Sequence, residues 1–161
     1  MFKNNTDEEW ELYGKHDPYY GVYTDPKFQR SSLNEDSKQD FFDSGYAYIE
    51  KVFKNIHKHI DDNFSPTNAL DFGCGVGRLV IPLSERVDQV TDIDVSDSML
   101  KEAKCNCTDR SISNVSLLKS DDTLSALDGK YSFIHSFFHR ISAHTSQERR
   151  KDSSSPHFPS R

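Results

Sequence analysis

The longest regular pattern of hydrophobic positions in this chain of 161 residues is helical. From about Lys38 onward, large apolar side chains recur three or four positions apart, which is the spacing of one helix face. These side chains are Phe42, Ile49, Val52, Phe53, Ile56 and Ile60. The polar stretch from Asn63 to Thr67, which contains Pro66, ends the pattern. The sequence therefore predicts an amphipathic helix over about residues 38–62.

Shorter apolar runs alternate with helical segments after that helix. The runs that predict buried strands are residues 68–72, 89–93, 115–118 and 132–138. Helices are predicted over 77–86, where Pro82 is close enough to the first turns to be tolerated, and over 97–107, with Ser96 as N-cap. Residues 122–129 predict a turn or one short helical segment. This alternation is typical of an α/β fold with a doubly wound, mostly parallel sheet.

The two ends of the chain differ from this middle part. Residues 1–37 are polar and rich in aromatic side chains. They predict a short helix around Trp10 and then an irregular segment, with turns at Asp17-Pro18 and Asp25-Pro26. Residues 139–161 are basic and rich in serine and show no period, so we expect a disordered tail. The sequence thus predicts one domain over 38–138 between two atypical ends.

Composition and charge exclude several classes of protein. The formal net charge is -6, whereas binding nucleic acid through its phosphates needs a basic face. No apolar run approaches the ~18 residues of a membrane span, and the polar N-terminus does not resemble a signal peptide. Cys74, Cys105 and Cys107 suggest neither a disulfide framework nor a metal site. We therefore expect a cytoplasmic protein that binds no nucleic acid, membrane or metal.

The residues most informative about function follow the first predicted strand. Gly73, Gly75 and Gly77 stand at alternate positions between that strand and a helix, an arrangement that brings bare backbone against a nucleotide-like ligand. The spacing is Gly-x-Gly-x-Gly and not the Gly-x-Gly-x-x-Gly of dinucleotide-binding folds, which disfavours a nicotinamide-dependent oxidoreductase. Asp71 would repel a pyrophosphate and suits a cationic ligand. A turn without a ligand is the alternative interpretation.

Acidic side chains also stand at the ends of the second and third predicted strands. Asp94 stands 17 positions after Gly77 in the sequence, which is about the separation at which an acid holds a ribose diol in related folds. The alternative is that Asp94 is only a neighbour of the Ser96 helix cap. Asp121 and Asp122 either accept from the amine of a base or simply face water. Together these acids predict a ligand that carries a cation, a ribose and an adenine.

In these motifs the chain resembles class I S-adenosylmethionine-dependent methyltransferases. The resemblance covers Leu70–Leu79, Asp92–Leu100 and Asp121, and more weakly the segments around Tyr19 and Phe42, which are similar to a lid region. It implies that residues 1–37 are lid-like, that S-adenosylmethionine is the cofactor, and that S-adenosylhomocysteine is the product. The cofactor-binding residues it implies are Asp71, Gly73, Cys74, Gly75, Gly77, Arg78, Asp94, Val95, Met99, Asp121, Asp122 and Ser136. Tyr19 and Tyr20 are expected to close over the cofactor.

The resemblance also implies parts that the sequence pattern does not provide. The family's sheet has seven strands in the order 3-2-1-4-5-7-6, and four are predicted here, so we expect a chain truncated or frame-shifted after about residue 138. The fourth strand would then be an exposed edge that favours self-association. The reaction would be methyl transfer to a small-molecule acceptor, and no catalytic base can be nominated. The alternative is an inactive cofactor-binding fragment that needs a partner. His135 suggests acid–base chemistry or a structural role.

Overall fold

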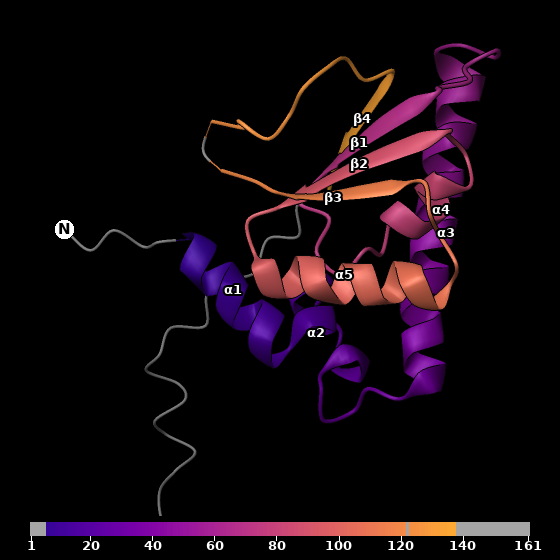
Figure 1. The fold of residues 1–161 in the computed structure, drawn as a ribbon. Helices are drawn as coiled ribbons and strands as arrows, with labels where there is room; N and C mark the ends of the chain where they lie inside the picture. Colours follow the sequence, from indigo (N-terminus) through magenta and orange to yellow (C-terminus); the bar gives the residue numbers. More distant parts are fainter. Residues whose placement is uncertain (1–5, 122, 138–161) are drawn as a thin grey trace, which may run out of the picture.

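Four parallel strands form the sheet of this protein, in the order β3-β2-β1-β4 (Figure 1). The computed structural model describes residues 6–121 and 123–137; Asp122 and the predicted tail over 139–161 lie outside this part. The strands are β1 Asn68–Phe72, β2 Gln89–Asp94, β3 Val115–Lys119 and β4 Phe133–Ser136. This is the predicted α/β fold, and the strand order is that of the first four strands of the family the sequence resembles.

The long helix α3 (Glu35–His59) begins three residues before the predicted start. The reason is a capping box that precedes the apolar stripe. Asn34 accepts from the backbone N–H of Ser37, and the Ser37 hydroxyl accepts from the backbone N–H of Asn34. Helix α5 (Asp97–Asp109) begins as predicted, because the Ser96 hydroxyl accepts from the N–H of Met99.

The helix predicted over 77–86 is much shorter in the structure. Only α4 (Val80–Ser84) is helical, and it follows a turn over residues 75–79. Gly77 has a φ of 88°, which is outside the right-handed helical region. Pro82 has no backbone N–H to donate within the helix. The glycine turn therefore extends further than the apolar pattern indicates.

The N-terminal segment is more helical than predicted. The expected helix around Trp10 is α1 (Thr6–His16), and two further helical pieces follow, α2 (Pro18–Val22) and the 3-10 helix η1 (Pro26–Phe28). The prediction of an irregular segment was wrong, because each proline stands at the first helical position. There its fixed φ suits a helix start and its missing N–H costs nothing.

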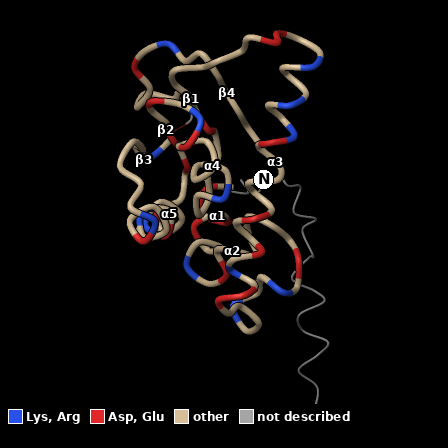
Figure 2. Tube along the Cα trace, turned by 90° about the vertical axis from the view of Figure 1, so that its right-hand side faces the viewer, with Lys and Arg blue, Asp and Glu red and all other residues tan. Residues whose placement is uncertain are grey.

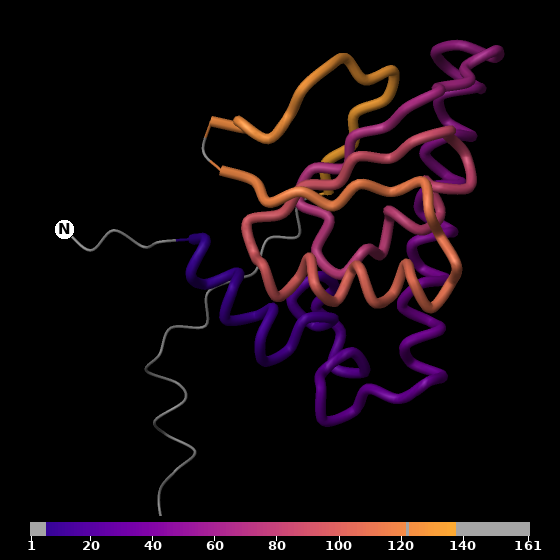
Figure 3. Tube along the Cα trace, viewed as in Figure 1, coloured from indigo at the N-terminus to yellow at the C-terminus, as the bar shows by residue number. Residues whose placement is uncertain are grey.

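All helices of the described residues lie on one face of the sheet. Ala69 and Val90 pack on that face against α3 and α4 in one core cluster, and Leu117 packs beside α5 in the other. On the opposite side, the segment between β3 and β4 arches away from the sheet (Figure 3). Ile134, on that opposite face of the edge strand β4, is 63% exposed. No helix in the described part of the chain is long and apolar enough to span a membrane.

Candidate functional site

The glycine turn is tied to the end of the neighbouring strand. The backbone N–H groups of Gly73 and Cys74 both donate to the carbonyl oxygen of Ile93, at 2.9 and 3.1 Å. A Cβ added to Gly73 would meet no atom within 4 Å, so the backbone faces open space there. A Cβ on Gly75, in contrast, would lie 2.3 Å from the side chain of Val22. The turn is therefore bare toward the ligand side and tightly covered by α2.

Asp94 connects the glycine turn to the start of α5. One carboxylate oxygen accepts from the N–H of Gly75 at 2.8 Å, and the other accepts from the N–H of Ser96 at 2.9 Å. Burial raises the pKa of Asp94, and these backbone hydrogen bonds act against that rise. Each oxygen keeps a further lone pair. The carboxylate is thus held in place and still has capacity to accept two hydroxyl groups.

A cavity of about 310 Å³ lies at the carboxyl ends of β1 and β2. This is where parallel α/β sheets bind ligands, and the size is at the lower end for a small-molecule site. Eight of the predicted site residues line it, namely Asp71, Gly73, Cys74, Gly75, Arg78, Asp94, Val95 and Met99. The bare backbone at Gly73 and the free capacity of Asp94 fit an adenosine ligand such as S-adenosylmethionine.

Four predicted site residues are not among those that line the cavity. Asp122 lies outside the described residues. Gly77 shapes the turn through its φ of 88°, and the Ser136 hydroxyl donates to the carbonyl of Phe72 at 3.3 Å. The carboxylate of Asp121 accepts from Thr123 and Ser125 in its own turn, which lowers its pKa. At the end of β3 it is the preceding residue, Ser120, that lines the cavity.

Asp71 belongs to a buried polar chain that the sequence did not reveal. The carboxylate of Asp71 lies 3.0 Å from Nδ1 of His135 on the adjacent strand β4. Nε2 of His135 is 3.2 Å from the hydroxyl of Tyr48 on α3. Asp71 and His135 are 2% and 8% exposed. His135 therefore fixes the orientation of Asp71, and both of its ring nitrogens are engaged.

Arg78 is a buried cation near Tyr48, the last member of this polar chain of side chains. Its guanidinium is enclosed by the rings of Tyr23, Tyr48 and Phe137, whose centroids lie 5.1 to 5.9 Å from its central carbon. Burial lowers the pKa of Arg78, opposed by Tyr23 and by Asp71. The site therefore places a negative and a positive side chain near the same end of the cavity.

A third buried acid, Asp92, stands beside Asp71 across the β1–β2 pairing. It is fully buried, and neither carboxylate oxygen has a hydrogen-bond partner within the described part of the chain. Burial, and then the nearby charges of Asp71 and Asp94, raise the pKa of Asp92 well above its usual value. The burial of Asp92 therefore favours its protonated form, and the residue does not line the cavity.

The N-terminal helices form a roof over the cavity that the sequence did not predict in detail. The roof residues are Thr6, Asp7, Trp10, Gly21 and Val22. The expectation that Tyr19 closes over the cofactor was wrong. Its ring packs in the core against Phe41 and Phe42, and its hydroxyl donates to Glu102 and Asn106 on α5. The side chain is needed to anchor α2, and so its neighbours Gly21 and Val22 face the cavity.

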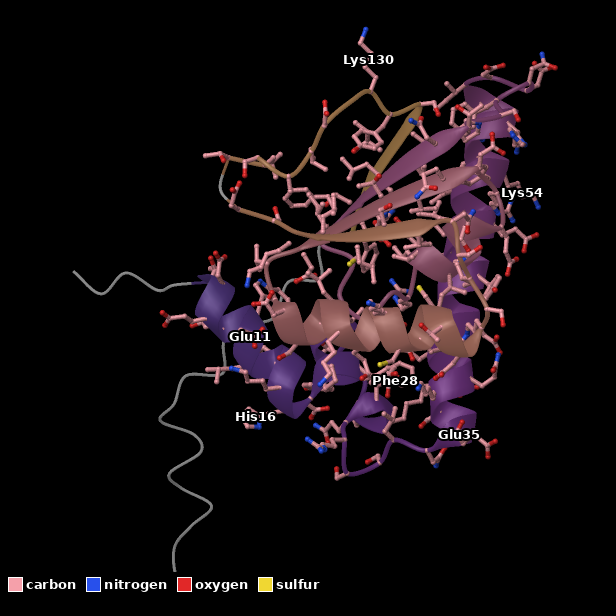
Figure 4. All side chains as sticks on the ribbon, viewed as in Figure 1. Glu11, His16, Phe28, Glu35, Lys54 and Lys130 are labelled. Atoms are coloured by element: carbon pink, nitrogen blue, oxygen red, sulfur yellow. The ribbon has the colours of Figure 1, made fainter. Side chains whose placement is uncertain are left out.

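Glu11 anchors the other roof helix. Its carboxylate accepts from the hydroxyl and N–H of Ser98 and from the hydroxyl of Ser96. Figure 4 shows Glu11 on α1 beside the first turn of α5. These hydrogen bonds lower the pKa of Glu11 to about 2. The sequence signals for the roof are the weak resemblance to a lid region and the aromatic character of residues 10–23, and neither of them indicates which residues of α5 the roof packs on.

Comparison with known proteins agrees with this geometry. A family model described as a methyltransferase domain matches residues 69–153. Aklanonic acid methyltransferase DauC of Streptomyces sp. (strain C5) is 30% identical over 102 residues, which are 58% of this chain and 46% of that protein. A tRNA/tmRNA (uracil-C(5))-methyltransferase of Wolinella succinogenes is 35% identical over 66 residues, which are 40% of this chain and 18% of the Wolinella succinogenes protein.

A solved structure shows the same fold over a longer stretch. Magnesium protoporphyrin IX methyltransferase (ChlM) from Synechocystis PCC 6803, with bound SAH, superposes with a TM-score of 0.55 at 25% identity. The match covers 84% of this chain and 57% of that one. The chain thus spans about half, or less, of the length of the relatives it matches. The family model nonetheless covers more than half of the chain, and with this structural match it shows that the chain belongs to the class I S-adenosylmethionine-dependent methyltransferases.

Proposed function

We propose that this chain binds S-adenosylmethionine in the cavity beneath α1 and α2 and supports methyl transfer to a small-molecule acceptor. The observation that carries the proposal is the Asp94 carboxylate. It lines the cavity while its two oxygens accept from Gly75 and Ser96. An acid held in this way accepts a ribose diol without having to reorganise.

The same proposal assigns the remaining cavity residues. Asp71, oriented by His135, would accept from the methionyl amine, and the bare backbone at Gly73 would lie along the methionine and ribose part. The cofactor supplies a methyl group on a sulfonium, which is already activated for transfer. The chain contributes positioning, and a base is needed only where the acceptor must lose a proton. Residues 1–37 would act as the lid of a cofactor-binding part over 38–138.

A small-molecule acceptor is favoured over RNA by charge. DauC is named for a small acid, whereas the Wolinella succinogenes relative is named for RNA. Acidic residues predominate in the first half of α3, and Figure 2 shows the lysines of its second half as a short basic stretch with acidic residues at both ends. A chain of net charge -6 lacks the electrostatic attraction that RNA phosphates require.

The alternative function is cofactor binding without turnover by this chain alone. It is favoured by the sheet face opposite the helices, where Ile134 is 63% exposed. Parallel sheets are ordinarily covered on both faces. A partner that covers this face would then complete the protein.

The first experiment is a calorimetric titration with S-adenosylhomocysteine. Saturable one-to-one binding is expected, and Asp94→Asn should weaken it by ~1.5–3 kcal/mol, since charge-assisted hydrogen bonds to the ribose are lost. Asp88→Asn, an exposed position just before β2, is the matched control and should leave the affinity unchanged. A folded wild-type protein that binds no S-adenosylhomocysteine would contradict the proposal. An assay for methyl release from the labelled cofactor then separates the enzyme from the binding protein.

A further inference from the structure

We propose that Asp92 is a reserve counter-charge for the cation of the cofactor, which holds a proton in the free protein and releases it to solvent when S-adenosylmethionine binds. The proposal rests on the function proposed above, because it concerns the same cavity and the same ligand. Asp92 is outside the predicted set of cofactor-binding residues and does not line the cavity. It would act through its charge, as a residue that determines the preference for substrate over product.

The first argument is that the Asp92 carboxyl group is buried without a partner. The residue is 0% exposed, and neither oxygen has a hydrogen-bond partner within the described part of the chain. Buried polar atoms in folded proteins nearly always have a partner, because leaving one unpaired is costly. An apolar side chain at this position of β2 would avoid that cost. The stability of the core therefore does not explain this acid.

The second argument is that the neighbours of Asp92 offer it no positive charge. Asp71 is its register partner on β1, and Asp94 stands two positions further along β2. Burial, and then the charges of these two acids, raise the pKa of Asp92. The thiols of Cys74 and Cys107 are also close enough for burial first, and then the charge of Asp92, to raise their pKa. All these groups are negative or neutral, so Asp92 keeps its proton until a cation arrives.

The basic groups on this side of the sheet face Asp71 and not Asp92. The imidazole of His135, on β4, lies 3.0 Å from the Asp71 carboxylate. The guanidinium of Arg78 is enclosed by aromatic rings and is attracted by Asp71. A ligand is therefore the source of positive charge that remains for Asp92.

The third argument is the position of Asp92 relative to the proposed ligand. Asp94 would hold the ribose diol and Asp71 the methionyl amine, with the bare backbone of Gly73 beneath the ligand between them. The sulfonium joins the ribose to the methionine part and would therefore lie between these two acids. Asp92 adjoins the same two acids from within the core. Charges attract more strongly there than in water, and the ligand adds a charge without changing the burial of Asp92.

This arrangement distinguishes the substrate from the product, which differ by one methyl group and one positive charge. When S-adenosylmethionine binds, Asp92 ionises and up to one proton per site goes to the solvent. Once the methyl group has left, the sulfonium is a neutral thioether, and Asp92 takes up a proton from the solvent. The site thus presents one more negative charge to the substrate than to the product.

The test counts protons by calorimetry in two buffers of different ionisation enthalpy, with S-adenosylmethionine and S-adenosylhomocysteine as probes. Near neutral pH, the excess released with S-adenosylmethionine should be up to about one proton per site larger for the wild type than for Asp92→Asn. The amine of each ligand contributes equally to both proteins, so their difference reports Asp92. The variant should bind S-adenosylmethionine about tenfold more weakly and S-adenosylhomocysteine within about twofold of the wild type, since one pKa unit is a tenfold change.

Two further variants and one spectrum complete the experiment. Asp92→Ala is also uncharged and has no buried amide, so it should behave as Asp92→Asn does. Asp88→Asn removes an exposed acid just before β2 and should behave as the wild type. In infrared difference spectra of the wild type, a band of a protonated carboxyl group should be lost with S-adenosylmethionine and kept with S-adenosylhomocysteine.

The inference is overturned if folded Asp92→Asn or Asp92→Ala keeps the proton count and the ratio of affinities of the wild type. If neither variant folds, the infrared spectrum decides, because S-adenosylmethionine that removes no protonated-carboxyl band also overturns it. In both cases the wild type still binds the ligands, and the proposed function stands. A wild type that binds neither ligand overturns both.

Discussion

Gly45 determines how closely α3 approaches the glycine turn over residues 75–79. A Cβ at this position would lie 2.1 Å from the carbonyl oxygen of Arg78, and a backbone atom cannot move aside as the end of a flexible side chain can. Gly45→Ala should therefore destabilise the protein by about 1–3 kcal/mol, even though alanine favours a helix by roughly 1 kcal/mol. The free energy of unfolding in urea measures the effect.

Glu50→Ala is the matched control, since Glu50 is exposed on the same helix. It should change stability by only a few tenths of a kcal/mol, roughly the difference in helix propensity. A Gly45→Ala protein as stable as the wild type would show that α3 shifts away from the loop without cost.

Individual acidic residues differ in how much of their position could be predicted from the sequence. The position of Asp94 in the cavity was predictable, because it follows from its place after a strand and from its separation from the glycines in the sequence. The pairing of Asp71 with His135 was not, because the two residues are 64 positions apart and meet only through strand pairing. Asp121 had the same strand-end signal as Asp94 but is used by its own turn. A pattern locates an acid at a strand end but not the direction in which its carboxylate points.

At the scale of elements, the interaction between α1 and α5 depends on one carboxylate. Because the pKa of Glu11 is lowered from 4.5 to about 2, the ionised group stabilises the folded state above pH 4.5. This contribution is lost as the pH falls from 4.5 toward 2. Glu11→Gln should cost about 1 kcal/mol at pH 7. The difference from the wild type should then shrink below pH 4.5, as measured by urea unfolding across pH.

Glu9→Gln controls for the general loss of an acid from α1, since Glu9 is exposed. Its stability should follow that of the wild type at every pH. A Glu11→Gln variant with an unchanged free energy of unfolding at pH 7 would mean that the hydrogen bonds to Ser96 and Ser98 do not hold the roof.

The elements were predicted unevenly, and the reason is the kind of signal each provides. Strands and the long helix follow hydrophobic periodicity, and their positions were predicted to within a few residues. The short pieces α2, η1 and α4 depend on Pro18, Pro26, Gly77 and Pro82, whose effects on the backbone are local. Proline at a first helical position and proline in a turn look alike in sequence, so the choice between them needs the tertiary contacts.

At the scale of the whole molecule, the sheet face opposite the helices is a candidate surface for self-association. Ile134 is 63% exposed there, on the edge strand β4. We expect concentration-dependent association in sedimentation experiments. Ile134→Lys should weaken it roughly tenfold or more, since burying an isoleucine contributes about 1.5–3 kcal/mol.

Leu12→Lys is the control, because Leu12 is also exposed, at 56%, but lies on α1. It should leave association unchanged. A wild-type protein that remains a monodisperse monomer at all concentrations, with one cooperative melting transition, would contradict the prediction.

The roof of the cavity also has a consequence for how the protein is made. Glu11 and Ser98 are 87 residues apart, so the ribosome needs roughly 4–17 s to synthesise the chain between them. During that time Trp10 and Tyr19 have no α5 against which to pack. Contacts between such distant segments form late in folding. The newly synthesised N-terminal helices are therefore the part of the chain that stays exposed to chaperones and proteases until α5 has left the ribosome.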